Sequence, residues 1–270
     1  MVTEVFRAGG ISYSYPDGRL GLAEASFGVA EGESLIVLGA NASGKSTLLH
    51  LLAGLVFPAA GEVQAFGTRL TEAALRDGEF ARRFRQRVQL LFQDADAMLF
   101  NPTVYDEIAF GPLQLDLPVD DVRQRVEEMV ALLGLGKVTQ QPPFALSGGE
   151  KKKVALAALL AVSPEVLLLD EPTTGLDPRF QRWFVEIALE LRELGKTLVT
   201  ATHDLHIVPE IGDRVLVLGE DHRIAAAGTP PDILGDVDLL LQVNLVHEHA
   251  HIHDDAIHLH PHAHLHEHEH

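Results

Sequence analysis

The sequence predicts an α/β protein in which a mostly parallel β-sheet is flanked by helices. Two observations support this fold class. Residues 34–38 and 166–169 are almost wholly apolar, which is typical of strands buried on both faces of a parallel sheet. Segments of strand and helix character also alternate along the chain, as expected when helices connect parallel strands.

The predicted elements follow in order. A strand over residues 11–15 precedes a turn at 16–18, and the strand 34–38 leads through a glycine-punctuated loop into a helix over 46–55. Further strands are predicted at 88–92, 166–169, 197–200 and 215–218, and further helices at 150–162 and 180–194. Residues 101–145 have helical character, with predicted breaks at Pro102, Pro112, Pro118, Pro142 and Pro143.

Composition excludes several classes of protein. The 270 residues include no cysteine, which rules out a disulfide framework and any thiolate nucleophile or metal ligand. The formal charge of −18 argues against a nucleic-acid partner, and the local run Arg82, Arg83, Arg85 and Arg87 is interpreted as a solvated helix face. We expect no signal peptide and no membrane span, which needs about 20 apolar residues, so any membrane role would depend on a spanning partner.

A phosphate-binding loop follows the strand at 34–38. Residues 39–46 read G-A-N-A-S-G-K-S, which fits G-x-x-x-x-G-K-[ST], and they lie between a predicted strand and a predicted helix. Successive N–H groups of such a loop bind phosphate oxygens, the lysine neutralises the β- and γ-phosphates, and the serine hydroxyl binds Mg²⁺. The predicted ATP-binding residues here are Gly39, Ala40, Asn41, Ala42, Ser43, Gly44, Lys45, Ser46 and Thr47, with Ser46 also a Mg²⁺ ligand.

Two acidic residues end the buried strand at 166–169. Asp170 is predicted to bind Mg²⁺, and Glu171 is predicted to polarise the water that attacks the γ-phosphate.

Residues 146–150, L-S-G-G-E, open a predicted helix upstream of these acids. Over about residues 2–225, the three motifs together resemble the ATP-binding subunits of ATP-binding-cassette (ABC) transporters. This resemblance implies a P-loop NTPase core with an additional antiparallel β subdomain and an inserted helical subdomain. We expect the core at 1–93 and 163–243, the helical subdomain at 94–162 and a separate tail at 244–270.

The resemblance also implies roles for single residues. Tyr15 matches the residue that stacks on adenine, with Tyr13 as the alternative. Gln93 matches the glutamine that senses the γ-phosphate and Mg²⁺, and His203 matches the histidine that hydrogen-bonds the γ-phosphate. Asp177 matches a loop that communicates across a dimer.

The resemblance implies a head-to-tail dimer with itself or with a paralogous ATPase. ATP would lie between the phosphate loop of one subunit and a signature segment of the other, which consists of Ser147, Gly148, Gly149 and Glu150. One departure is Ala42, where the family often has glycine; we expect a slightly altered loop and retained binding.

Residues 92–100, 104–112 and 146–155 resemble the energy-coupling-factor type of ABC ATPase, which includes cobalt and nickel uptake ATPases. This implies a peripheral protein on the cytoplasmic face of the membrane. Its partners would be a transmembrane coupling subunit that contacts residues around 93–112 and metal-specific membrane subunits. The alternatives are the ATPase of a vitamin importer and a soluble, non-transport ABC ATPase.

The C-terminal tail holds eleven of the fifteen histidines, mostly at every second position, and no lysine or arginine. Alternating imidazoles suit borderline metals such as Ni²⁺ and Co²⁺, and residues two apart in an extended chain share a face. We expect a disordered metal-binding arm, with a cloning tag or a tail without function as alternatives. The candidate ligands are His247, His249, His251, His253, His258, His260, His262, His264, His266, His268 and His270.

Overall fold

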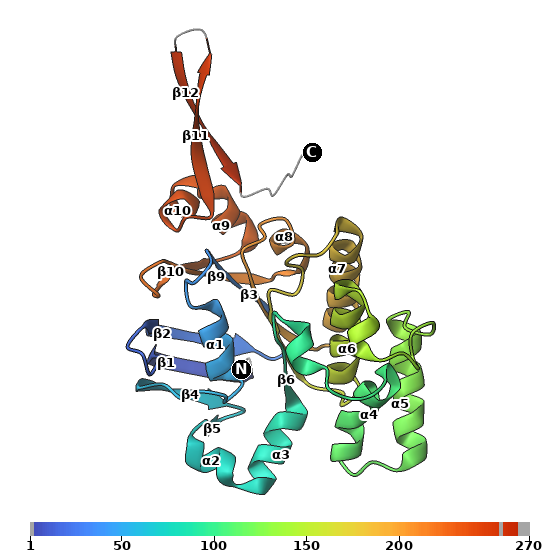
Figure 1. Cartoon of the computed structure of the whole chain (residues 1–270). Helices are drawn as coiled ribbons and strands as arrows, with labels where there is room; N and C mark the ends of the chain where they lie inside the picture. Colours follow the sequence, from blue (N-terminus) through green and yellow to red (C-terminus); the bar gives the residue numbers. More distant parts are fainter. Residues whose placement is uncertain (1–2, 254–255, 264–270) are drawn as a thin grey trace. The chain divides into compact units, whose positions relative to one another are not determined.

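The computed structural model describes residues 3–253 and 256–263 (Figure 1). The chain forms two compact units. The first comprises Met1–Leu70 and Ala201–His270, and the second comprises Thr71–Thr200. Across the described ranges, we find no helix that combines the length and the apolar character needed to cross a bilayer.

An antiparallel sheet forms the N-terminal part of the first unit. Its strands are arranged in the order β2-β1-β4-β5, and Phe6 on the central strand pairs with Val29 on one side and Ala65 on the other. The strand predicted at 11–15 is the end of the longer β1, and no specific range was predicted for the other three strands. The bounds are β1 Glu4–Ser14, β2 Leu20–Ala30, β4 Ala60–Ala65 and β5 Thr68–Arg69.

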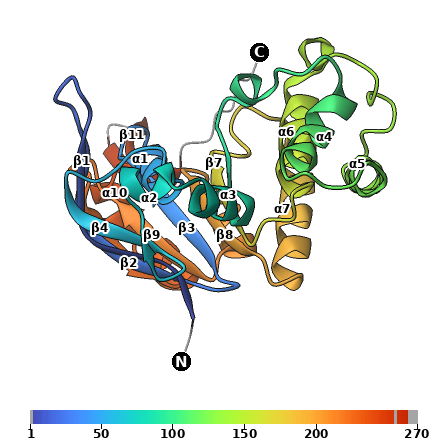
Figure 2. The same cartoon turned by 90° about the horizontal axis from the view of Figure 1, so that it is seen from below.

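Parallel strands form the second layer of this unit. β3 (Ser34–Gly39) pairs in parallel with β9 (Arg214–Leu218), and β10 (Ile224–Gly228) pairs antiparallel with β9. Every residue of β3 is buried, as its apolar sequence predicts. Helix α1 (Lys45–Leu52) follows β3 and contacts β2, β3 and β4 (Figure 2).

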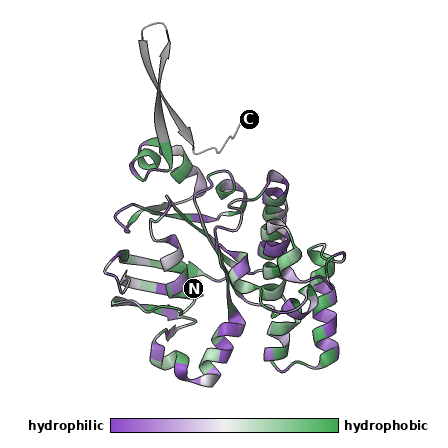
Figure 3. Cartoon of the chain, viewed as in Figure 1, coloured by the Kyte–Doolittle hydropathy of each residue, from purple (hydrophilic) through white to green (hydrophobic). Residues whose placement is uncertain are grey.

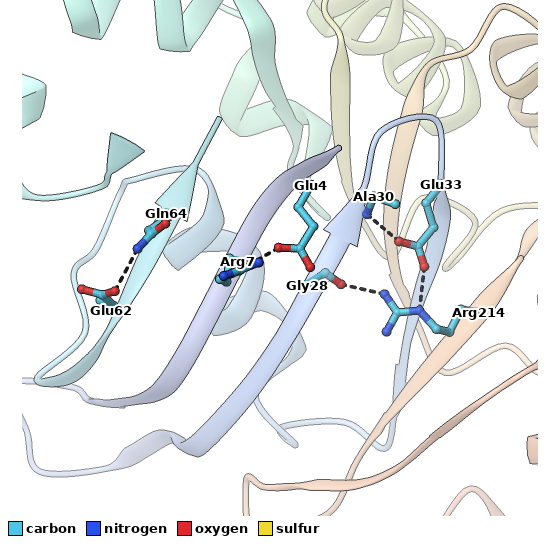
Figure 4. A network of polar contacts seen from close by, with 8 residues as sticks. All are labelled: Glu4, Arg7, Gly28, Ala30, Glu33, Glu62, Gln64 and Arg214. Carbon is cyan, nitrogen blue, oxygen red and sulfur yellow. Dashed lines mark hydrogen bonds and ion pairs between the residues drawn. The ribbon is translucent and has the colours of Figure 1, made fainter. Parts of the chain in front are cut away.

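A polar network joins β2 to the parallel strands (Figure 4). Arg214, at the start of β9, donates to Glu33 Oε1 at 2.6 Å and to the carbonyl of Gly28 at 2.6 Å. The other carboxylate oxygen of Glu33 accepts from the N–H of Ala30 at 2.7 Å. Because this carboxylate and guanidinium are both largely shielded from water, the bonds fix the start of β3 against β2.

In the second unit, strands occur in the order β8-β7-β6, and β6 and β7 are parallel. All three were predicted within a few residues of their ends. Their bounds are β6 Val88–Leu91, β7 Val166–Asp170 and β8 Thr197–Thr202. Three helices of this unit lie outside the predicted helical subdomain: α2 Glu72–Arg76, α3 Gly78–Arg87 and α7 Pro178–Glu193.

Residues 94–162 contain only helices and loops, and α4, α5 and α6 pack against one another (Figure 2). Pro112 was predicted to break a helix but lies inside α4. Only two residues follow it before the helix ends, so its missing N–H removes a bond only from the final turn. The bounds are η1 Ala95–Met98, α4 Val104–Gln114, α5 Val119–Leu132, η2 Pro143–Ala145 and α6 Gly148–Leu160.

The arginine run lies on α3, which is coloured mainly as hydrophilic in Figure 3. Arg82 pairs with Asp116 at 2.9 Å, Arg83 pairs with Glu79, and Arg87 pairs with Glu165 at 2.7 Å. These ion pairs are solvent-exposed, in agreement with the interpretation as a solvated helix face.

The end of the first unit contains a β-hairpin. The tail was expected to be disordered, but strands β11 (Val246–His253) and β12 (Ala256–Ala263) pair as an antiparallel hairpin. The alternation of histidine with apolar residues, which was interpreted as low complexity, is also the period-two pattern of a strand. The tail histidines at 264, 266, 268 and 270 lie outside the described residues. The short helices before the hairpin are α8 Val208–Ile211, α9 Pro230–Gly235 and α10 Val237–Gln242.

Two glycines in the antiparallel sheet region provide a test of backbone packing. Gly61 and Gly67 have φ of 78° and 76°, so alanine at either position meets the same left-handed strain. A Cβ at Gly61 would lie 2.3 Å from the carbonyl oxygen of Gly10, whereas a Cβ at Gly67 would have no atom within 4 Å.

We expect Gly67→Ala to cost about 1–2 kcal/mol of unfolding free energy, because the left-handed backbone strain is the only penalty at this position. Gly61→Ala should cost about 1–3 kcal/mol more, because the backbone must also move. Urea denaturation followed by circular dichroism measures both values. Equal losses would show that β1 and β4 do not approach as closely as described.

Candidate active site

The phosphate-binding loop lies in the first unit, between β3 and α1. Gly44 immediately precedes the helix with φ of 107°, and a Cβ there would lie 2.3 Å from the carbonyl oxygen of Gly21. Only glycine fits this position, because any side chain would collide with the backbone of β2. Ala42 adopts φ of 66°, the left-handed conformation that glycine adopts without strain. Ala42, which stands where the family often has glycine, is thus a locally strained residue in an otherwise intact loop.

Positive charge and hydrogen-bond donors gather inside this loop. Lys45 is buried, and its ammonium donates to the carbonyls of Gly39 at 2.8 Å and Ala40 at 3.0 Å. The first-turn N–H groups of α1 have no acceptor within the helix, which leaves them available to an anion. Ser43 Oγ is buried in the loop and has no hydrogen-bond partner among the described residues.

A cavity of about 600 Å³ opens beside the loop. Tyr15, Ala42 and the residues from Gly44 to Thr47 line it. The hydroxyl of Tyr15 lies 2.7 Å from that of Thr47, which fixes the tyrosine at the start of the helix. Tyr13 contacts the Tyr15 ring edge-on, with 5.1 Å between ring centroids. The two candidates for adenine stacking therefore lie together, and Tyr15 is the one on the cavity wall.

Four residues of this wall were missed by sequence reasoning: Arg19, Leu20, Gly21 and His222. The Arg19 guanidinium lies 5.5 Å from the centroid of the Tyr15 ring. His222 lies far away in the sequence, in the turn between β9 and β10, and its carbonyl accepts from the N–H of Ala23 at 2.9 Å. No local pattern links residue 222 to the phosphate loop, because the link is this tertiary pairing.

The acidic pair lies in the second unit, at the end of β7. Asp170 and Glu171 are both buried, each with 4% exposure. Glu171 has φ of 45°, and its carboxylate accepts from the hydroxyl of Thr174 at 2.8 Å. Left-handed backbone at a residue other than glycine costs about 1–3 kcal/mol and concentrates at functional sites. This backbone and the Thr174 bond fix the orientation of the predicted base.

Lys152 on α6 holds the loop that carries Glu171. Its buried ammonium donates to the carbonyls of Glu171, Pro172 and Thr174 at 2.9, 3.1 and 3.3 Å. Burial lowers the pKa of Lys152, and the nearby charges of Glu171 and Asp170 oppose that shift. Sequence reasoning missed this positioning residue.

Helical periodicity is the sequence signal that could have identified Lys152. In the run of three lysines, residue 151 pairs with Asp96 at 2.6 Å and residue 153 lies 4.5 Å from the Trp183 ring centroid. Only the middle lysine is buried toward the acidic loop.

The signature segment forms the N-terminus of α6. Ser147 caps the helix in a capping box, in which its hydroxyl accepts from the N–H of Glu150 and donates to the Glu150 carboxylate at 2.7 Å. The Ser147 hydroxyl and the Ser147 backbone N–H both donate to the Glu150 carboxylate, and these two bonds lower the pKa of Glu150. Ser147 and Gly148 are exposed, so the segment can face a second protein.

The remaining predicted residues follow other strands or begin a helix. Gln93 is exposed just after β6, and His203 is partly buried just after β8. Asp177 is exposed and caps α7, where it accepts from the N–H of Phe180 at 2.8 Å. The phosphate loop, Tyr15 and His203 belong to the first unit. The second unit holds Gln93, the signature segment, Asp170, Glu171 and Asp177.

These donors fit Mg²⁺ and ATP. The glycine cradle and the buried ammonium suit a polyphosphate, and the Tyr15 ring suits a base. The Ser46 hydroxyl and the Asp170 carboxylate are hard oxygen donors, the type that Mg²⁺ prefers.

Known proteins agree with this interpretation. The family model for ABC transporters matches residues 22–174. The nickel import ATP-binding protein NikO of Rhodobacter capsulatus is 46% identical over 248 residues, which cover 91% of this chain and 97% of NikO.

Two solved structures have similar folds. The protein cbiO1 of Clostridium perfringens, part of the ABC transporter complex cbiONQ, has a TM-score of 0.76 and 33% identity over 90% of this chain and 95% of its own. The ATP-binding cassette MJ0796, as a post-hydrolysis dimer with ADP and phosphate, has a TM-score of 0.74 and 26% identity over 83% of this chain and 98% of its own. This chain therefore belongs to the ATP-binding subunits of ABC transporters, has the P-loop NTPase fold and is an ABC-type ATPase.

Proposed function

We propose that this chain is the ATP-hydrolysing subunit of an energy-coupling-factor importer of nickel or cobalt, bound to the cytoplasmic face of the membrane. The observation that carries the ATPase role is the phosphate-loop cavity, in which a buried lysine and a sterically required glycine adjoin an aromatic wall. The metal is supported by the similarity to NikO, a nickel import protein whose match covers most of the chain. We retain the predicted boundaries, with a core at 1–93 and 163–243 and a helical subdomain at 94–162.

The residues divide the chemistry between them. Lys45 and the loop N–H groups bind the phosphates and offset their charge. Glu171 orients and polarises the attacking water, while Lys152 and Thr174 hold its loop. His203 and Gln93 contact the γ-phosphate. Bound Mg²⁺ neutralises phosphate oxygens, and Ser46, Gln93 and Asp170 would hold it.

A head-to-tail dimer completes each ATP site in this proposal. The exposed helix N-terminus at Ser147–Glu150 is a second anion-binding element, and one chain already holds phosphate with its own loop. The similarity to the MJ0796 dimer supports this assembly. Asp177 lies at the start of α7, where it can contact the neighbouring subunit.

The second unit carries a groove suited to a membrane partner. It has a volume of about 780 Å³ and lies between α3, α4 and the end of α6. Its apolar wall includes Phe100 and Phe110, which are 67% and 40% exposed and pack edge-on at 5.0 Å. Glu107, buried beside them, accepts from the Asn101 side chain at 2.9 Å and so holds the loop that carries Phe100. We propose this groove, which includes Phe100 and Phe110 from the predicted contact region 93–112, as the binding site for a transmembrane coupling subunit.

The dimer is tested by complementation between two inactive variants. Lys45→Ala should abolish tight ATP binding, and Ser147→Arg should block hydrolysis while ATP still binds. In an equimolar mixture, the loop of the serine variant meets the intact signature segment of the lysine variant, so part of the ATPase activity should return. Phosphate release measures it, and Lys137→Ala, an exposed lysine outside both motifs, is the control. A mixture as inactive as its components would contradict the shared site.

Glu171→Gln should lower the hydrolysis rate by about 10²–10⁴-fold, because an amide cannot accept the proton of the attacking water. The amide oxygen can still accept from Thr174, so the loop should keep its conformation. ATP binding should persist, and an ATP-dependent dimer should accumulate on size-exclusion chromatography. Turnover at the wild-type rate would remove Glu171 from the role of base.

Transport is tested in cells that express the chain with its membrane partners. Phe100→Asp should reduce uptake of radioactive Ni²⁺ or Co²⁺ to background, because a charge in the groove opposes an apolar partner helix. Basal ATPase activity of the purified chain should remain. Leu194→Asp is the matched control, because Leu194 is 73% exposed and lies outside the groove.

Three outcomes of this experiment would count against the proposal. Normal uptake by Phe100→Asp would reject the groove. Uptake of a labelled vitamin instead of metal would support the alternative of a vitamin importer. Absence of any coupled uptake would support the alternative of a soluble ATPase.

A further inference from the structure

The hairpin β11–β12 brings the tail histidines into a defined arrangement. Its antiparallel register places His247 opposite His262, His249 opposite His260 and His251 opposite His258. The hairpin continues directly from the folded part of the first unit. Leu245 and Val246 are buried at its base, Leu245 donates to the carbonyl of Leu240 at 2.9 Å, and β11 contacts α10.

This register separates the hairpin into two chemically different faces. Directly opposite residues of an antiparallel pair lie on one face, and so do residues two apart in each strand. All seven histidines of the two strands therefore occupy one face. The other face holds Val246, Glu248, Ala250, Ile252, Ile257, Leu259, Pro261 and Ala263.

The separation depends on the register as well as on the alternating sequence. A shift of one residue in either strand would place histidines of β11 opposite apolar residues of β12 and divide them between the faces. In the register described, Ile252 lies opposite Ile257, and Ala250 lies opposite Leu259.

The spacing on the histidine face suits a metal ion. Opposite Cα atoms in such a pair are about 4.5–5.5 Å apart, and residues two apart along a strand are separated by about 6.5 Å. Two neighbouring cross-strand pairs thus place four histidine positions around one point. Sets of three or four neutral imidazoles bind Zn²⁺, Ni²⁺ and Co²⁺.

We propose that the histidine face of β11–β12 is a binding site for a borderline divalent metal. His249 and His260 form the central pair, which is a member of both possible four-histidine sets. Residues 247–270 contain no lysine or arginine, so the segment carries no fixed positive charge that would repel the ion. The site is independent of the proposed transport role, since binding needs neither ATP nor a membrane partner.

Composition-matched variants of the full-length protein test the proposal. The variant His249→Ala/Ala250→His/Leu259→His/His260→Leu keeps every residue type but moves the central pair to the opposite face. Ni²⁺ affinity, measured by competition with a chromogenic chelator, should fall by about tenfold or more. A control variant, Ala250→Leu/Leu259→Ala, exchanges residues on the apolar face and should bind Ni²⁺ like the wild type. Basal ATPase activity should be unchanged in both and reports folding of the rest of the chain.

A second measurement separates the hairpin from the histidines that follow it. Truncation after Ala263 should retain the tight Ni²⁺ site, because all three cross-strand pairs remain. Wild-type affinity in the face-exchanged variant would show that histidine content alone binds the metal and would overturn the proposal. Loss of the tight site on truncation would also overturn it, by placing the ligands in residues 264–270.

Discussion

A strand that is buried on both faces can offer reactive side chains only where it ends, and this constraint organises the protein. β3 is buried from Ser34 to Gly39, so its chemistry begins in the loop that follows. β7 is buried throughout and delivers Asp170 and Glu171 at its end. Gln93 and His203 likewise come just after β6 and β8. The burial that stabilises each strand therefore also determines that the predicted phosphate-binding residues lie at the strand ends.

Much of this could be predicted from sequence because the signals are local. The loop at residues 39–46 and the acidic pair lie directly beside apolar runs, and the elements around them were predicted within a few residues. The tail is the segment for which the sequence pattern was most ambiguous. Alternating histidines satisfy both a low-complexity pattern and a strand pattern, and composition alone does not choose between them. The prediction at Pro112 failed, because its effect depends on how much helix follows it.

The residues that sequence reasoning missed act through tertiary contacts. His222 reaches the cavity wall because its turn pairs with Ala23, and Lys152 matters because its ammonium reaches carbonyls beyond the next strand. No specific range was predicted for the antiparallel strand β2, although it supplies Gly21, the neighbour that forces residue 44 to be glycine. In each case the constraint comes from a partner remote in sequence.

The three carbonyl bonds of Lys152 have a mechanical consequence. The lysine lies on the helix that begins at the signature segment, about 6 Å along the axis from Gly148. It grips the same loop that carries Glu171. In a head-to-tail dimer, a displacement of this helix by nucleotide held in one subunit would thus be transmitted to Glu171, the proposed base, of the other. In such a dimer, the hydrogen bonds of this one buried ammonium would couple each site to the occupancy of its neighbour.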